Sequence, residues 1–597
     1  MAQYLYEQDI VPFLLDLVCL VYMDNKTISA LLSEIGDILD IKGENPFKVR
    51  AYHTAARNIE ALTVPVQKLI EEGKLGEVRG IGKALEEKIT EYVTTGKMTY
   101  YEDLQKSLPE GLLDILRIPS VGPKKVKVLY DKLDVTNIQE LEYACNENRL
   151  VELDGFGEKT QQKILEGIKF ISRHKGQYLL SDAIPVAETL ISALKKYKTI
   201  KRVSLAGSIR RRKEVVKDID IVASSDKPED VMGYFVKLPL VVEIIAKGTT
   251  KSSIRLETGI AADLRVVKDS EFPYALHHFT GSKEHHIAMR GRANKMGLKI
   301  NEYGIFREKD NKLIKAKDEE EFFKVLGLNY IPPEMRENTG EVEFAEKSPL
   351  PELIEEDDIK GIFHNHTNWS DGSATIEEMA ESARKIGLKY LGLSEHTKSA
   401  SYAGGLDEMR LRKWMAEVDK INKCYKDFCI LKGAEVDILK DGSLDYSDKV
   451  LSELDYVICS IHSNFNMQEE EMTSRVIKAL TNPYVDIFAH PTGRLLLGRE
   501  GYKINFEKIF LAAKRSNKII ELNAHPQRLD LDWLHLKQAK EMGVKIAINP
   551  DAHNPNGLAD VFKYGVPTAR RGWLTKEDVI NTLSLEKVLD IFGKNVA

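Results

Sequence analysis

Cysteine is scarce in this sequence: its 597 residues include only Cys19, Cys145, Cys424, Cys429 and Cys459. An odd count without any C-x-x-C pair predicts neither a disulfide framework nor a zinc finger, and it fits a reducing cytoplasm. Long hydrophobic runs are lacking too. The apolar stretch 10–22 is short for a membrane span and contains Pro12 and Asp16, and no basic segment precedes it. We therefore expect no membrane partner, and we interpret 1–22 as an N-terminal extension of unknown role.

A surplus of positive charge is also missing. The chain has 86 Lys and Arg against 92 Asp and Glu, a net charge of −6, so any nucleic-acid surface must be a local patch such as 201–217. With 43% hydrophobic and 30% charged residues, the composition is that of globular domains. The length predicts about four of them.

The stretch 206–221 combines the features of a phosphate site and a metal site. A Gly-Ser turn follows an apolar segment, and a basic run then leads into Asp218 and Asp220. Side chains two apart on a strand point to the same face, and divalent cations relieve the repulsion between neighbouring carboxylates. Turn N–H groups and arginines can hold phosphates. The pattern indicates two-metal nucleotidyl transfer; the alternative is a solvated hairpin with surface charges.

Three short stretches near the N-terminus share one pattern, in which a helix ends, the chain turns at Gly and another helix begins. They resemble helix-hairpin-helix motifs, which present backbone N–H groups to a DNA phosphate while nearby lysines add charge. A glycine that merely ends a helix is the alternative for any one of them. The expected DNA-binding residues are Gly80, Gly82, Gly122, Lys124, Lys125, Gly155 and Gly157.

Residues 24 to about 338 resemble a family X DNA polymerase of the DNA polymerase β type. The motifs that carry this resemblance are Gly207-Ser208, Asp218-Ile219-Asp220, Asp263 on a later strand, Phe279-Thr280-Gly281-Ser282 and Asn301-Glu302-Tyr303-Gly304. The resemblance implies a lyase-like helical subdomain followed by fingers, palm and thumb. It also implies gapped or nicked DNA and dNTPs as substrates, with two Mg²⁺ ions as cofactors.

The same resemblance implies roles for single residues. Asp218 and Asp220 would bind both catalytic metals, and Asp263 would bind the one that activates the primer 3′-hydroxyl. Nucleotide contacts would come from Gly207, Ser208, Arg211, Phe279, Gly281 and Arg290. Lys88 stands at the position of the family's lyase lysine, although a surface lysine on a helix is the alternative.

Two positions depart from the family pattern. His278 stands where vertebrate relatives carry Tyr beside the sugar, and His286 stands where an Asn usually contacts the incoming base. Discrimination against ribonucleotides and the minor-groove contact therefore stay open.

The last 240 residues alternate apolar strand-like runs with helical segments, and a His, Asp or Glu follows most of the runs. This pattern predicts a β/α barrel with its site at the carboxyl ends of the strands, where imidazoles and carboxylates suit Mn²⁺, Zn²⁺ or Fe²⁺. The segment resembles the PHP (polymerase and histidinol phosphatase) domain. The resemblance implies a phosphoesterase with up to three Mn²⁺ or Zn²⁺ ions, held by His364, His366, Glu435 and Asp551; by Glu435, His462 and His490; and by Asp371, His396 and His553.

Three other residues of this segment have weaker expectations. Glu395 replaces the usual Asp before the motif His, and we interpret it as a support for the ligands. Arg494 could hold a substrate phosphate. His525 could do the same or be a core residue.

Taken together, the sequence predicts a multidomain α/β protein: a helical helix-hairpin-helix region, a polymerase β-like palm and thumb, and a distorted (β/α)7 PHP barrel. The expected parts are 1–22, an extension; 23–95, lyase-like; 96–175, fingers; 176–267, palm; 268–338, thumb; 339–357, a solvated acidic linker; and 358–597, the barrel.

Both halves together resemble bacterial PolX, which implies a monomeric gap-filling repair polymerase with a 3′-5′ exonuclease. One alternative makes the barrel an abasic-site endonuclease or a 3′-phosphatase. Another makes the chain a DNA-end binding scaffold.

Overall fold

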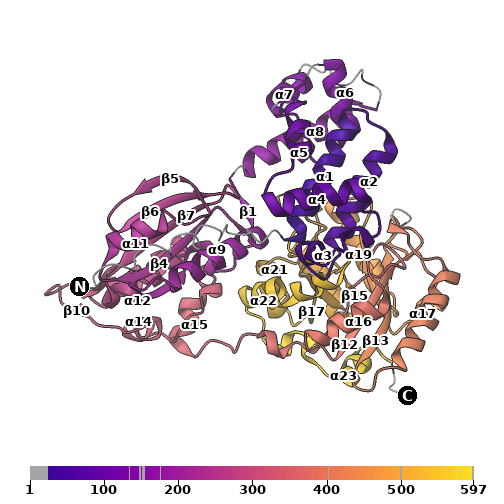
Figure 1. Cartoon of the computed structure of the whole chain (residues 1–597). Helices are drawn as coiled ribbons and strands as arrows, with labels where there is room; N and C mark the ends of the chain where they lie inside the picture. Colours follow the sequence, from indigo (N-terminus) through magenta and orange to yellow (C-terminus); the bar gives the residue numbers. More distant parts are fainter. Residues whose placement is uncertain are drawn as a thin grey trace, which may run out of the picture. The chain divides into compact units, whose positions relative to one another are not determined.

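The computed structural model describes residues 24–109, 111–133, 135–146, 150, 153, 155–174, 176–400, 403–497 and 500–594. The chain forms two compact units, Met1–Arg173 and His174–Ala597, whose elements are labelled in Figure 1. The expected extension, 1–22, lies outside the described residues. Among the helices that the structure describes, none combines the length and the apolar character that crossing a bilayer requires.

Unit 1 is helical throughout its described part. Its helices are α1 (Asn25–Ile41), α2 (Pro46–Glu60), α3 (Val66–Glu71), α4 (Lys83–Thr95), α5 (Thr99–Lys106), α6 (Pro123–Leu133), α7 (Ile138–Asn146) and α8 (Glu158–His174). The Asp24 side chain caps α1 by accepting from the Thr27 N–H, which satisfies an N–H that has no partner inside the helix. The predicted apolar face of α1 (Ile28, Leu31, Ile35 and Leu39) is buried against α2.

Unit 2 begins with a five-stranded mixed sheet, the palm sheet, in the strand order β2-β4-β7-β6-β5. The elements of this part of the chain are β1 (Tyr178–Leu179), α9 (Leu180–Lys195), β2 (Ile200–Leu205), α10 (Gly207–Arg210), β3 (Val215–Val216), β4 (Asp218–Ser225), α11 (Pro228–Phe235), β5 (Val241–Lys247), β6 (Lys251–Leu256) and β7 (Ala261–Val267). Strands β1 and β3 pair with each other in a separate two-stranded sheet. Strands β4 and β7 run parallel, while the other pairs of this sheet are antiparallel. Helices α9 and α11 pack on one face, through alternate residues such as Ile219 and Ile221.

The next segment, 272–347, covers the expected thumb. It contains α12 (Phe272–Thr280), α13 (Lys283–Lys295), β8 (Leu298–Asn301), β9 (Gly304–Arg307), β10 (Leu313–Ile314), α14 (Glu319–Val325) and α15 (Glu341–Lys347). The structure differs here from the expected solvated linker at 339–357. Val342 and Ala345 of α15 are buried in the thumb core, and the Glu341 carboxylate lies 2.8 Å from Nδ1 of His285. One acidic residue of this stretch, Glu341, therefore makes a buried contact and is not exposed to solvent.

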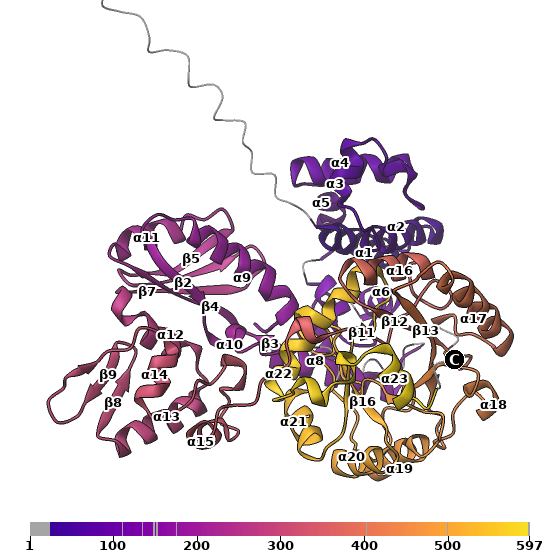
Figure 2. The ribbon, with the colours of Figure 1, turned by 90° about the horizontal axis from the view of Figure 1, so that it is seen from below.

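The C-terminal part of unit 2 is a parallel seven-stranded barrel with the strand order β11 to β17. Its strands are β11 (Gly361–Ile362), β12 (Tyr390–His396), β13 (Cys429–Asp437), β14 (Tyr456–Ser460), β15 (Ile487–Phe488), β16 (Ile519–Asn523) and β17 (Ile546–Asn549). Its helices are α16 (Ile376–Lys385), α17 (Glu408–Asn422), α18 (Asp448–Leu451), α19 (Glu469–Leu480), α20 (Phe506–Arg515), α21 (Trp533–Glu541), α22 (Val566–Arg571) and α23 (Leu585–Ile591). Figure 2 shows helices α17 to α21 on the outside of the strands.

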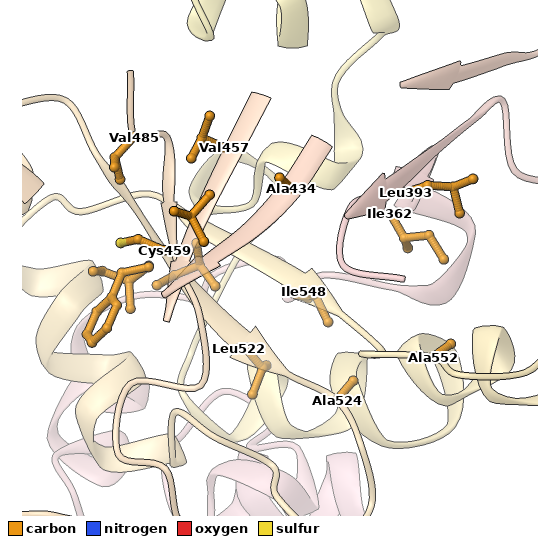
Figure 3. Packing of buried hydrophobic residues seen from close by; sticks show 14 of the residues in the cluster. Ile362, Leu393, Ala434, Val457, Cys459, Val485, Leu522, Ala524, Ile548 and Ala552 are labelled. Carbon is orange, nitrogen blue, oxygen red and sulfur yellow. The ribbon is translucent and has the colours of Figure 1, made fainter. Parts of the chain in front are cut away.

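The barrel is nearly closed just beyond the ends of its first and last strands, β11 and β17. Asn365 and Ala552 form a parallel bridge, and the His366 N–H donates to the Ala552 carbonyl at 2.9 Å. Because both faces of the parallel sheet are covered, its strands are apolar almost throughout. Figure 3 shows side chains from several of these strands, Ile362, Leu393, Val457 and Leu522 among them, in one buried cluster.

Candidate functional site

The three aspartates predicted for the palm lie together on two neighbouring strands. Asp218 and Asp220 alternate along β4 with Ile219 and Ile221, which face α9 and α11. Asp263 pairs directly with Asp220 in the parallel ladder between β4 and β7. Because alternate residues of a strand point to opposite faces, all three carboxylates lie on the face of the sheet that α9 and α11 leave uncovered.

The charges of these aspartates are poorly balanced by the protein. Burial, with the neighbouring Asp218 and Asp263, raises the pKa of Asp220 to about 7, and burial with Asp263 raises the pKa of Asp218. Asp263 has a partner, the Lys251 ammonium at 2.6 Å. Carboxylates held together against their own repulsion are suited to bind divalent cations.

Gly207 occupies a place that no side chain could fill. Its φ is +57°, and a Cβ at this position would lie 1.9 Å from Oδ2 of Asp220. The Gly-Ser turn thus brings its backbone against the aspartates, with half-buried Ser208 next in the chain. This is the arrangement expected when the triphosphate and the metals share one site.

The arginines of the predicted phosphate cradle contact the thumb segment. The Arg210 guanidinium pairs with Glu319 and donates to Oγ1 of Thr280 at 2.7 Å. Nε of Arg211 donates to Glu337 at 3.0 Å, and Nη1 donates to the Thr280 carbonyl. Arg211 is therefore buried in this conformation, and it would have to leave Glu337 in order to hold a phosphate.

The predicted sugar pocket is assembled from the end of α12 and the turn that follows it. The Arg265 guanidinium lies over the Phe279 ring, 5.2 Å from its centroid, and a Cβ on Gly281 would lie 2.8 Å from Nη1 of Arg211. Arg290 is exposed on α13. The guanidinium of Arg211 thus occupies the space beside Gly281.

The two departures from the family pattern contact one another. The His278 and His286 rings stack with centroids 5.2 Å apart, and Nε2 of His286 lies 2.6 Å from the His278 carbonyl. Burial lowers the pKa of His286 to about 4 and also lowers the pKa of His278. Both are therefore neutral at pH 7, and His286 already has a hydrogen-bond partner in the backbone.

The three predicted hairpins of unit 1 share one backbone geometry. Gly80, Ser120 and Gly155 all have positive φ. Two residues later, the Gly82, Gly122 and Gly157 carbonyls each accept the first hydrogen bonds of a helix. A Cβ on any of these three later glycines would meet nothing within 4 Å, so each turn is open to close approach by a phosphate.

The lysines of the second hairpin differ in their surroundings. Lys124 is exposed, whereas Nζ of Lys125 donates to the Ser120 carbonyl at 2.9 Å. Lys125 thus holds the turn itself.

Lys88 lies in an aromatic pocket of unit 1. Its Nζ donates to Oη of Tyr52 at 2.8 Å and lies 3.7 Å from the centroid of the Tyr100 ring. Burial, with the nearby Lys48 charge, lowers the pKa of Lys88. This differs from the surroundings of a freely solvated lysine, and a lowered pKa favours the nucleophilic neutral amine.

The barrel brings all nine predicted ligands to the carboxyl ends of its strands. The ligands form four overlapping groups, and within each group the ligand atoms lie within 4.8 Å of one another. The groups are His366, Asp371, His396 and His553; His364, His490 and Asp551; His364, His366 and Glu435; and His396, Glu435 and His462. Glu435, at the end of β13, is the centre, with its carboxylate 2.9 Å from His490, 3.0 Å from His396 and 3.2 Å from His462. The expected sets of ligands therefore overlap more than their motif positions implied.

Several polar atoms of these ligands are buried without a hydrogen-bond partner in the described part of the chain. They include Nε2 of His364, both ring nitrogens of His366, Nδ1 of His396 and Oε2 of Glu435. Unpaired buried polar atoms are costly, and divalent cations would satisfy them. His490 and Asp551 also have positive φ, 30° and 52°, a strain that residues other than glycine tolerate mainly at functional sites. The donors thus fit metal ions.

Acidic side chains and imidazoles lie next to one another in the cluster, and they shift the pKa values of its histidines in opposite directions. Burial acts against the charge of His364, but Glu521, Asp551 and Glu435 outweigh it and hold the pKa of His364 well above its usual value. Burial and the neighbouring His396 and His553 lower the pKa of His366 to about 3.

Three further carboxylates support the ligands. Glu521, in β16, lies 2.8 Å from Nδ1 of His364 and accepts the His490 N–H at 2.8 Å. Asp437 lies 3.1 Å from Nδ1 of His462. Sequence reasoning missed both, although each stands in an apolar strand run. Glu395, expected in this role, accepts from the N–H of Thr367 at 3.1 Å and from the hydroxyls of Thr367 and Ser370, and so fixes the loop after β11.

Arg494 and His525 have local partners. Nε and Nη2 of Arg494 donate to the carbonyls of Arg528 and Leu529, so these groups hold a loop. Nδ1 of His525 accepts the Gln527 N–H at 3.3 Å.

Family models match four segments of the chain. These are a helix-hairpin-helix domain at 23–98, a SAM-like helix-hairpin-helix tandem at 112–169, the DNA polymerase beta thumb at 275–337 and the PHP domain at 363–525. They confirm the predicted fold class, with helix-hairpin-helix segments, a polymerase β-like thumb and a PHP domain.

Curated relatives match either nearly the whole chain or about a third of it. The DNA polymerase/3′-5′ exonuclease PolX of Bacillus subtilis (strain 168) is 41% identical over 575 residues, which cover 96% of this chain and 100% of that protein. A probable phosphatase of Thermoanaerobacter sp. (strain X514) is 34% identical over 237 residues, 38% of this chain and 91% of the relative. A probable phosphatase of Acetivibrio thermocellus is 31% identical over 202 residues, 32% and 78% respectively.

Proposed function

This chain belongs to the PolX family of DNA polymerases with a 3′-5′ exonuclease, and we propose that it repairs short gaps in DNA, adding nucleotides at the palm and removing them at the barrel. The observation that carries this conclusion is the presence of two separate sets of metal-ligand side chains, one around Asp220 and one around Glu435. A polymerase that can remove an unextendable 3′ end before filling the gap suits base-excision repair.

The palm residues support nucleotide addition. Asp218 and Asp220 would hold two Mg²⁺ ions, and Asp263 would hold the one nearest the primer 3′-hydroxyl. In-line phosphoryl transfer needs positioning and neutralisation of charge more than covalent participation by the protein. Gly207 and Ser208 would offer the turn to the triphosphate, and Arg211 would join them after exchanging Glu337 for phosphate.

The barrel residues support hydrolysis of a phosphodiester. Mn²⁺ or Zn²⁺, when bound, would lower the pKa of an attacking water. Glu435 would hold several ligands in one place, while Glu521 and Asp437 fix the ring orientations of His364 and His462. The open glycine turns of unit 1 would bind the DNA backbone without reading its sequence.

The test uses one labelled duplex with a short gap, assayed with and without dNTPs. Asp263→Ala should abolish extension and leave 3′-5′ degradation at the wild-type rate, whereas His364→Ala should do the reverse. A matched control in each half, Asp226→Ala in the palm and Asp427→Ala in the barrel, changes an exposed carboxylate away from both sets. Loss of both activities in one folded variant would contradict the two-site proposal, and gap binding without any incorporation would favour a DNA-end scaffold.

A second candidate for the barrel is hydrolysis of a phosphomonoester or cleavage at an abasic site. It is favoured by the relatives whose printed name is probable phosphatase, because the same ligands could serve these reactions. Substrates with a normal 3′ end, a 3′-phosphate and an abasic site separate the activities. If phosphate is released faster than nucleotides, and if His364→Ala loses this release, the barrel is mainly a 3′-phosphatase.

A further inference from the structure

One arginine beside the barrel cluster has a buried donor group that the described residues leave without a hydrogen-bond partner. Arg528 lies in the loop between β16 and α21, and its side chain is 20% exposed. Its Nη1 is buried and has no hydrogen-bond partner among the described residues. Its Nε lies 3.7 Å from Oδ2 of Asp551, which is too far for a hydrogen bond.

Asp551 does not need Arg528 as a counter-ion. Its carboxylate already lies 3.3 Å from Nε2 of His366 and 3.5 Å from Nε2 of His364, and it accepts from Nδ2 of Asn523 at 3.0 Å. Arg528 also adds a positive charge beside a group of imidazoles, because its Nε faces the Asp551 carboxylate that His364 and His366 already contact. A guanidinium placed among imidazoles and cation ligands is favourable when an anion joins them.

The loop that carries Arg528 is held in place from outside the site. Nε of Arg494 donates to the Arg528 carbonyl at 2.9 Å, and the Thr492 N–H donates to the Asp530 carboxylate at 3.0 Å. The Arg528 N–H itself donates to the His525 carbonyl at 2.8 Å. The backbone is thus fixed while one side of the guanidinium is left without a partner, which is the arrangement of a preorganised ligand-binding group.

We propose that Arg528 binds a non-bridging oxygen of the phosphate that the barrel hydrolyses. The planar guanidinium can donate two parallel hydrogen bonds to a phosphate, and its Nε lies 3.7 Å from the carboxylate of Asp551, one of the expected ligands. Arg528 therefore takes the role that the sequence suggested for Arg494. This inference rests on the barrel being the phosphoesterase site.

The first test compares Arg528→Gln and Arg528→Lys with Arg412→Gln, a control that changes an exposed arginine of α17 paired with Glu453. On a labelled oligonucleotide, we expect 3′-5′ degradation by Arg528→Gln to be slower by about 10- to 100-fold, because a charge-assisted contact is lost. The degradation rate of Arg528→Lys should lie between those of Arg528→Gln and the wild type, and the rate of Arg412→Gln should equal that of the wild type. Gap filling and bound-metal content should stay unchanged in all three. Wild-type turnover by Arg528→Gln, or its loss of metal, would overturn the proposal.

The second test identifies the oxygen that Arg528 contacts. A methylphosphonate at the 3′-terminal linkage removes one negative oxygen. It should slow the wild type strongly and Arg528→Gln only slightly, because that variant has already lost the contact. Equal penalties in both proteins would overturn the proposal.

Equilibrium binding separates a failure of this inference from a failure of the proposed function. Isothermal titration with dAMP in the presence of Mn²⁺ should show affinity about tenfold weaker in Arg528→Gln than in the wild type. If Arg528→Gln binds dAMP more weakly but the wild type does not degrade DNA, the exonuclease activity is contradicted and the phosphate contact is supported. Equal binding would contradict the contact whatever the activity.

Discussion

Nη1 of Arg571, in barrel helix α22, donates a 2.6 Å hydrogen bond to the carbonyl oxygen of Arg211 in the palm. Nη2 of Arg571 lies 3.3 Å from the Glu337 carboxylate, which also accepts from Nε of Arg211. One fully buried side chain of the barrel therefore fixes the backbone of the arginine expected to hold the triphosphate, and it shares the carboxylate that this arginine contacts. Palm, thumb segment and barrel meet at these three residues.

We expect Arg571→Lys to raise the KM for dNTPs by about 3- to 10-fold, because a lysine cannot hold the Arg211 carbonyl and Glu337 in one fork. Steady-state gap filling measures this change, and exonuclease turnover in the same preparation should stay constant. Arg570→Gln is the matched control, since Arg570 lies next in the same helix but pairs with Glu334 and Glu355. An unchanged KM in folded Arg571→Lys would mean that the contact does not position Arg211.

The metal-free palm should become less stable as pH rises. The native pKa of Asp220 is about 7, against 3.8 for a free carboxyl, so between these values the native state holds a proton that the unfolded chain has released. Its contribution to stability is therefore complete below about pH 4 and lost through pH 7. In EDTA at pH 8, Asp220→Asn should raise the melting temperature of the palm transition by about 3 to 8 °C.

Calorimetry at pH 5 and pH 8 checks this sign, since at pH 5 the gain should fall to about a third of its value at pH 8. Mg²⁺ should stabilise the wild type and not the variant. A variant that melts lower than the wild type at pH 8 would show that the carboxylate is not repelled there.

The ligands could be predicted from sequence because each type of site follows a local rule. Asp218 and Asp220 share a face by their spacing, and His364 to His553 follow apolar runs whose ends meet at one rim of a barrel. Partners that depend on tertiary packing could not be predicted. Nothing near Arg211 in the sequence indicates Glu337, and nothing in the acidic stretch 339–357 indicates that Glu341 is buried against His285. Glu521 looked like any buried strand residue, since only the fold brings it to His364.

Glu521 should control the affinity of the barrel for metal. Because its carboxylate lies 2.8 Å from Nδ1 of His364, it fixes a proton there and leaves Nε2 to face the other ligands. Glu521→Gln should weaken Mn²⁺ binding by about 10- to 100-fold without changing gap filling. Titration calorimetry with Mn²⁺ measures the affinity, and excess Mn²⁺ should restore exonuclease activity.

Asp486→Asn is the control for this change. Asp486 is a half-buried carboxylate of the same barrel that accepts the Val457 N–H, and none of its contacts in the described part of the chain is with the imidazoles. If Glu521→Gln and Asp486→Asn weaken Mn²⁺ binding by the same factor, the loss reflects general destabilisation and not the orientation of His364.

Lys88 should act as a Schiff-base nucleophile on the sugar left by an abasic site. Its amine lies against Tyr52 and Tyr100, and burial together with the Lys48 charge lowers its pKa, so the neutral, nucleophilic form is reached at lower pH than for a free lysine. Borohydride should trap the wild type on DNA with a 5′-deoxyribose phosphate. Lys88→Ala should reduce trapping at least tenfold and leave gap filling unchanged.

The pH dependence of the trapping rate shows whether Lys48 tunes the Lys88 amine or only binds the phosphate through its positive charge. Lys48→Met removes the neighbouring charge that disfavours protonation of Lys88, so its pKa should rise and the rising limb of the trapping rate should move to higher pH. Lys83→Met, which changes an exposed lysine of the same helix, should leave the pH of this rising limb unchanged. If Lys48→Met only lowers the rate by the same factor at every pH, Lys48 binds the phosphate without tuning the amine. If Lys88→Ala traps as well as the wild type, another amine is the nucleophile.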